Sequence, residues 1–285
     1  MSTAYGSGIS PAEPRIDFGW ISQAWALFRL QAGAWVGALL LYFIIIALIG
    51  GALAFATGLY AYFHVLMLAG PAGMASVNPH DELLHILPFS LLLAPFNAIL
   101  LGGLYRMAVR QARGETIAAT GLFSAFDVAL PLLLVGFFIA ILISLLSLLL
   151  PRVAGLLNLF WQGLFMFAPL AIVDKGLSAP AAIVESFQLL KRQWLMTALF
   201  YFVLAIVSVL GGLLCGVGFF ATYPLLFLSL AVGYLSFTEP GRPIGPLAPG
   251  SPDYGAAQPG VWPPPPSVAP PPPSWPPPPG GTGSV

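Results

Sequence analysis

The sequence predicts an all-α integral membrane protein, and three observations support that fold class. Only 7% of the 285 residues are charged and 58% are hydrophobic, whereas about a quarter of a soluble domain is charged. Six apolar runs are each long enough to cross the hydrocarbon of a bilayer, for which roughly 20 residues suffice. A proline-rich segment follows the last run. We therefore predict six transmembrane helices and a disordered proline-rich C-terminal tail.

The chain begins with two short segments outside the predicted crossings. Residues 1–15 are mostly small and polar and are predicted to be disordered. They contain neither the basic segment nor the apolar segment that is typical of a cleaved secretory signal peptide. Between residues 16 and 30, apolar residues recur at helical spacing and include Trp20 and Trp25. We expect an amphipathic helix here, lying either at the headgroup level of the membrane or packed on the helix bundle.

The membrane domain is predicted to cover residues 16–238. The first run is interpreted as one crossing rather than two split at Gly50-Gly51. Pro88 and Pro95 predict a kink in the second crossing rather than its end. The segment 64–85 between these crossings is polar and is expected to be an exposed loop. The predicted spans are about 34–60, 86–105, 128–150, 153–173, 194–214 and 219–237.

Two polar connections follow the second and fourth crossings. The first holds three arginines, and the second, residues 174–193, has an apolar stripe of Ile183, Phe187, Leu190 and Trp194. Each connection contains a short amphipathic stretch that leads directly into a membrane helix, as does the stretch before the first crossing. The sequence thus predicts three repeats of an amphipathic interfacial helix followed by a transmembrane hairpin.

The basic residues are distributed unevenly among the connections. With six crossings, nine of the ten Lys and Arg residues lie on one side of the membrane and only Arg152 lies on the other. Because Lys and Arg mark cytoplasmic connections, this distribution predicts that both termini are cytoplasmic.

The second connection and its surroundings carry a resemblance to a known family. The stretch GGLYRMAVRQARGETIAATGLFSAF, together with Pro169, Asp174, Ser186 and Lys191, resembles uncharacterised bacterial polytopic membrane proteins akin to the membrane domain of glycerophosphodiester phosphodiesterases. The resemblance covers about residues 16–238 and implies an all-helical domain in the bacterial inner membrane, with cytoplasmic amphipathic segments. It implies no activity, because the proline-rich tail stands where a catalytic domain would follow.

The tail, residues 239–285, is predicted to adopt polyproline II conformation. Eighteen prolines lie between Thr238 and Val285, and two WPPPP motifs begin at Trp262 and Trp275. Proline fixes φ and removes the backbone donors that helices and sheets need. These runs are candidates for docking on the aromatic-lined groove of a proline-motif-binding protein. A semi-rigid spacer is the alternative.

Motifs of catalysis and of metal or cofactor binding are weak in this sequence. His64, His80 and His85 lie near two acidic residues, but the spacing of His80 and His85 does not place both on one helical face. Gly176-Leu-Ser178 resembles a serine nucleophile motif, yet no histidine follows His85, and Ser178 is better explained as a helix cap. We predict no enzymatic activity, no metal site and no cofactor.

Two sets of polar residues remain as candidate sites. Arg106, Arg110, Arg113, Lys191 and Arg192 are candidates for contact with anionic lipid headgroups. Asn97, Asn158 and Gln162 lie within predicted crossings and are a candidate polar site in the bundle. Hydrogen bonds between helices are the alternative role for these amides.

The leading hypothesis for function is a membrane anchor or scaffold that organises lipid or protein partners through its amphipathic helices and its tail. The alternative is a permease for a small neutral or lipid-like solute. A formal net charge of zero and the lack of a basic aromatic-rich run argue against a nucleic-acid partner. The sequence allows a homo-oligomer but does not indicate one.

Overall fold

Helices make up all regular structure in the residues that the computed structural model describes, which are 14–70, 79–150, 152–213 and 218–245. No strand occurs among them. The first part of the chain forms α1 (Gly19–Leu30), α2 (Ala32–Ala56), α3 (Leu59–Leu68) and α5 (Pro79–Ala112). Two 3-10 turns follow, η1 (Ala119–Phe123) and η2 (Phe126–Val128), and then α6 (Ala129–Leu149), α7 (Ala154–Leu164) and α8 (Ala168–Lys175). The last elements are α9 (Ala179–Leu190), η3 (Lys191–Gln193), α10 (Trp194–Leu213) and α11 (Phe219–Thr238).

Six segments of the described chain are long and apolar enough to cross a membrane, which confirms the predicted architecture. Their bounds differ from the predicted spans mainly where an amphipathic helix runs straight into a crossing. They are Ala32–Ala56, Pro88–Ala112, Ala119–Leu142, Leu157–Lys175, Ala179–Gly212 and Phe219–Thr238. The chain therefore has the architecture of a multi-pass membrane protein.

The connection between the first two crossings is more helical than predicted. α2 continues through Gly50-Gly51, as expected for one crossing, and ends before Gly58, whose φ of 73° separates α2 from α3. Glycine adopts this left-handed conformation without a steric penalty. α3 then carries His64, and α5 already begins at Pro79. The predicted loop at 64–85 is thus wrong at both of its ends, because apolar residues continue to Leu68 and helix starts again at the proline.

Prolines have different consequences in the second and fourth crossings. α5 is one helix through Pro88 and Pro95, so neither proline ends it. The fourth crossing is divided into α7 and α8, and Pro169 stands in the first turn of α8. At this break the buried Ser186 hydroxyl of α9 donates to the Leu164 carbonyl (2.9 Å) and accepts from the Phe167 amide (3.3 Å). Ser186 thereby satisfies two backbone groups that the interrupted helix leaves without helical partners.

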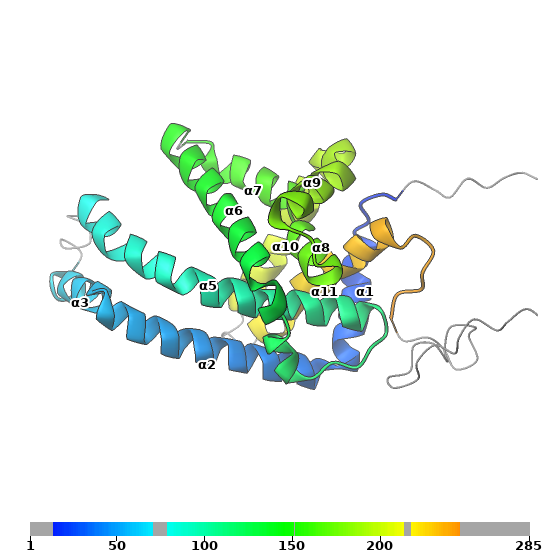
Figure 1. Cartoon of the computed structure of the whole chain (residues 1–285), viewed down its shortest axis with the longest axis horizontal. Coiled ribbons are helices and arrows are strands. Elements are labelled where there is room, and N and C mark those ends of the chain that lie inside the picture. Colours follow the sequence, from blue (N-terminus) through cyan, green and yellow to red (C-terminus); the bar gives the residue numbers. More distant parts are fainter. Residues whose placement is uncertain (1–13, 71–78, 151, 214–217, 246–285) are drawn as a thin grey trace, which may run out of the picture. The chain divides into compact units, whose positions relative to one another are not determined.

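α11 lies in the core of the bundle and contacts α1, α2, α5 and α10 (Figure 1). The ring of Trp20 from α1 packs so closely on α11 that a methyl group at Gly233 would lie 2.6 Å from it. Trp20 also makes edge contacts with Phe200 and Phe237, at centroid distances of 5.2 and 6.1 Å. Of the two places expected for the first amphipathic helix, the structure therefore shows packing on the bundle for the Trp20 face. Trp25 remains exposed.

Apolar side chains also cover the outer surfaces of the helices. Leu40, Ile44 and Leu48 form an exposed stripe along α2, at intervals of four residues. A similar stripe on α10 contains Leu195, Leu199 and Phe202. Stripes of this kind are costly in water but suit contact with lipid tails, which are as apolar as leucine.

The three predicted repeats differ in their amphipathic part. Helices α1 and α9 occupy this position in the first and third units, whereas the second has only η1 and η2. In α9 the buried face consists of Ala179, Ala182, Ser186 and Leu190. Phe187 and Trp194 of the predicted stripe are instead exposed. The face that approaches the bundle is the one with the small residues, because small side chains allow close packing.

Candidate functional site

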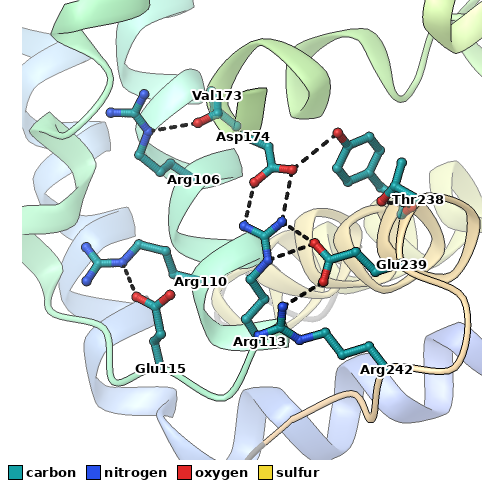
Figure 2. Close-up of polar contacts among 10 residues, drawn as sticks. Arg106, Arg110, Arg113, Glu115, Val173, Asp174, Thr238, Glu239 and Arg242 are labelled. Atoms are coloured by element: carbon teal, nitrogen blue, oxygen red, sulfur yellow. Dashed lines mark hydrogen bonds and ion pairs between the residues drawn. The ribbon is translucent and has the colours of Figure 1, made fainter. Parts of the chain in front are cut away.

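Charged residues gather at one end of the bundle, which we call the polar end and define by residues 14–18, 106–127, 173–194 and 239–245. Its centre is Arg113, directly after α5. The Arg113 guanidinium donates to both carboxylate oxygens of Asp174 at the end of α8, at 2.5 and 3.0 Å, and to Glu239 just after α11 (Figure 2). The Asp174 side chain is only 7% exposed. One arginine thus joins the ends of three crossings.

Two further contacts extend the Arg113 cluster. Arg242 donates to the second oxygen of Glu239 at 2.7 Å, and the hydroxyl of Tyr234 donates to Asp174 at 3.3 Å. The cluster therefore contains two cations and two carboxylates and is close to neutral. Oppositely charged side chains that hydrogen-bond in this way can be partly buried, because their hydrogen bonds to each other replace the hydrogen bonds to water that burial removes.

The ionisation of this cluster follows from its hydrogen bonds. Burial by itself lowers the pKa of Arg113, but hydrogen bonds with Asp174 and Glu239 raise it by more, so the pKa lies above the ordinary value. Burial raises the pKa of Glu239, yet hydrogen bonds from Arg113 and Arg242 outweigh it and the pKa lies below the usual 4.5. Both groups remain charged near neutral pH.

The other two arginines of this connection are also paired within the chain. Arg106 binds Asp127 with two nitrogens, at 2.7 and 3.0 Å, and also donates to the backbone carbonyls of Val173 and Ser124. Arg110 donates to Glu115 at 2.7 Å, and the side chains of this pair are more exposed than those of Arg113 and Asp174. The three arginines of this connection, which are predicted to contact lipid headgroups, thus all have partners inside the protein. Lipid contact by them stays a prediction.

Three glutamines that no sequence motif marks hold the amphipathic α1 and its neighbours in place. The buried Gln111 accepts from the Trp35 indole and donates to the Leu27 carbonyl, each at 2.6 Å. Gln31, between α1 and α2, donates to the Glu115 carbonyl and accepts from the Ile117 amide. Gln193 makes the corresponding pair of bonds near the start of the described chain, to the Pro14 carbonyl and the Ile16 amide, each at 2.8 Å.

The amides of the candidate bundle site form two hydrogen-bonded sets on different helices. Asn97 on α5 accepts from the Tyr42 hydroxyl of α2 at 2.7 Å. Gln162 on α7 donates to Asn158 at 3.0 Å and accepts from the Tyr201 hydroxyl of α10 at 2.6 Å. The structure thus brings Asn158 and Gln162 together, one helical turn apart. It assigns Asn97 to a different helix pair.

The remaining predicted residues have varied positions. Lys191 and Arg192 are exposed in η3. His64 stacks on Tyr60 within α3, at 6.0 Å between ring centroids, and the described residues contain no group of three or more His, Cys, Asp or Glu side chains that could hold a metal ion. Ser178 has the N-cap position of α9, although its hydroxyl makes no capping hydrogen bond. Trp262 and Trp275 lie outside the described residues.

Comparison with known proteins gives no family for this chain. No family model matches it, and neither a curated protein nor a solved structure shows significant similarity to it. The resemblance to the membrane domain of glycerophosphodiester phosphodiesterases therefore stays a prediction. The helices and the polar end define the chain as a polytopic all-helical membrane protein.

Proposed function

We propose that the chain is a membrane anchor and scaffold that organises lipid and protein partners at one surface of a bacterial inner membrane. In this proposal the polar end faces the cytoplasm, in agreement with the concentration of basic residues in its connections. The proline-rich tail is the segment that binds a protein partner.

The observation that carries the proposal is the attachment of the chain just after the last crossing. Glu239 binds Arg113, and the amide of Gly245 donates to the Ala112 carbonyl at 2.8 Å. Residues 239–245, predicted to belong to the free tail, are therefore held against the end of α5. A binding segment that leaves the membrane from a fixed point has a defined reach, which suits a scaffold.

The amides in the crossings fit this role as structural bonds between helices. Asn97, Asn158 and Gln162 all take part in hydrogen bonds within the bundle. Hydrogen bonds between membrane helices contribute about 0.6 kcal/mol each on average. No catalytic arrangement is needed for this function, and we propose none.

Proximity labelling in cells tests the role of the tail. A biotin ligase fused to the C-terminus of the full chain should label a set of proteins that is lost when Trp262 and Trp275 are both replaced by alanine. Tyr254→Ala is the matched control, because it removes an aromatic residue of the tail outside the WPPPP motifs. Identical labelling by all three chains would leave the spacer as the better explanation.

Transport of a small neutral solute is the second candidate, favoured by the polar set of Asn158, Gln162 and Tyr201 between α7 and α10. It predicts that proteoliposomes take up a solute, and that replacing Asn97, Asn158 and Gln162 by leucine abolishes the uptake. Unchanged uptake by a correctly inserted triple variant would remove the basis for a permease.

A further inference from the structure

A second group of cations lies at the polar end, away from Arg113. Arg15 stands shortly before α1, while Lys191 and Arg192 are the first two residues of η3, between α9 and α10. All three side chains are exposed. Although Arg15 and Lys191 are far apart in the sequence, the fold brings their segments together.

Gln193 makes the connection between these segments. Its side-chain amide donates to the carbonyl of Pro14 and its side-chain oxygen accepts from the amide of Ile16, each at 2.8 Å. The two bonds flank Arg15 on both sides and fix its backbone beside η3. In addition, the ring of Phe18 contacts Phe200 of α10 at 5.7 Å between centroids, which is a second attachment of this segment beside η3.

The charge of this group differs from that of the Arg113 cluster. Arg106, Arg110, Arg113, Lys175 and Arg242 each pair with a carboxylate of the protein. In the described part of the chain, no carboxylate pairs with Arg15 or Lys191. The nearby Asp17 is exposed and accepts a hydrogen bond from the Gly19 amide at 2.7 Å. Arg15 and Lys191 therefore form a locally positive pair.

The apolar surface next to these cations faces outward. Trp194 follows η3 directly and is 50% exposed, and Leu195, Met196 and Leu199 of α10 continue the exposed surface. Tryptophan is enriched at membrane interfaces, where its ring lies at the level of the headgroups. Cations at the start of a lipid-facing helix, beside such a tryptophan, are placed where phospholipid phosphates lie.

We propose that Arg15 and Lys191, flanked by Arg192, form a binding site for the headgroup phosphate of an anionic phospholipid, whose acyl chains lie along the exposed face of α10. Gln193 acts as a positioning residue because it holds Arg15 beside Lys191. The inference deepens the proposed function by naming a lipid partner of the anchor. It does not depend on any partner of the tail.

The test uses the full chain purified in an uncharged detergent and titrated with short-chain phosphatidylglycerol, with binding measured by thermophoresis. Phosphatidylcholine of the same chain length should bind more weakly, since it carries no net charge. Arg15→Gln and Lys191→Gln should each weaken phosphatidylglycerol binding about fivefold, the effect of one basic residue near an anionic surface. Both side chains are exposed, so neither change disturbs the core.

Gln193→Leu separates an assembled site from simple charge. It removes no charge, yet it should weaken binding about fivefold by releasing Arg15. In that background, Arg15→Gln should have no further effect, because residues that act as one unit are not additive. An equal loss from Arg15→Gln in both backgrounds would overturn the proposed site.

Arg29→Gln is the matched control for general attraction to anionic lipid. Arg29 is exposed at the far end of α1, about 18 Å of helix away from the start of that helix, and its replacement should leave the affinity unchanged. An equal loss of affinity for Arg29→Gln and Arg15→Gln would show that the lipid is attracted by the overall positive charge and not by a site.

Two further outcomes distinguish the ligand and the proposals. Full competition by millimolar inorganic phosphate would overturn a lipid site in favour of a phosphate site. Identical labelling with and without Trp262 and Trp275, in contrast, would refute the scaffold and leave these affinities unchanged.

Discussion

The last crossing is less hydrophobic than the first crossing, yet it is more deeply buried in the protein. α11 buries 12 of its 20 residues, including Leu228 and Tyr234. α2 is more hydrophobic, yet among its 25 residues only Trp35, Ala38, Leu39 and Tyr42 are buried. In water the more apolar helix would be expected inside. In a bilayer both surroundings are apolar, so close packing and polar partners decide which helix becomes central.

The largest effect is expected where polar contacts hold the end of α11. Arg113→Gln would leave Asp174 and Glu239 partly buried without their cation, and should reduce the free energy of unfolding by about 3 kcal/mol. Arg110→Gln is the control, since the pair with Glu115 is exposed and should contribute less than about 1 kcal/mol. Reversible unfolding by sodium dodecyl sulfate in mixed micelles measures both. Equal effects would mean that the Arg113 cluster does not stabilise α11.

A leucine on each helix tests the comparison directly. Leu228 of α11 is fully buried, whereas Leu48 of α2 is 69% exposed. Leu228→Ala should destabilise the protein by about 2 kcal/mol through lost packing, while Leu48→Ala should change stability by less than about 0.5 kcal/mol. The same unfolding assay applies. A large loss at Leu48 would show that a second protein surface, rather than lipid, covers α2.

Replacing one glycine on each helix by alanine should give a smaller difference in stability, again with the larger loss on α11. A methyl group at Gly233 would collide with the Trp20 ring, so Gly233→Ala should cost about 1 kcal/mol and displace α1. Nothing lies within 4 Å of the corresponding position at Gly51. Gly51→Ala should therefore be neutral or stabilise α2 slightly, because alanine is the better helix former. Trp fluorescence reports the movement of Trp20, and an unshifted spectrum for Gly233→Ala would contradict the close packing.

The smallest expected effect is a pH dependence of the α11 end. The pKa of Glu239 is lowered in the folded protein, so its contribution to stability is present above pH 4.5 and is lost as the pH falls through the folded-state pKa. The difference in stability between the native chain and Glu239→Gln should be constant from pH 7 to about pH 5 and shrink at lower pH. A difference that grows on acidification would refute this ion pair.

Much of the fold was predictable because transmembrane helices have a strong local signature. The six crossings, the single helix through Gly50-Gly51 and the continuation of α5 through Pro88 follow from length and composition alone. The burial of Trp20 and the exposure of Trp25 did not follow. Both residues belong to one apolar stripe, and hydrophobicity cannot distinguish a lipid neighbour from a protein neighbour.

The polar end was only partly predictable for a related reason. A cluster of arginines is visible in the sequence, and Asp127 lies in the same connection, but the partners of Arg113, Asp174 and Glu239, come from other connections. Nor does spacing indicate that Gln193 binds residues on both sides of Arg15. Such long-range pairs depend on how the helices pack. The only local sign of the Gln193 contacts in the sequence is that this glutamine stands next to an apolar run.

The contact between Trp20 and Gly233 also determines when the amphipathic α1 can reach its final place. Synthesis from the N-terminus delivers Trp20 long before Gly233 enters the membrane, so its partner is missing while most of the domain is made. During that time the apolar face of α1 must be covered by lipid or by a chaperone. Completion of the last helix is therefore the event that closes the domain.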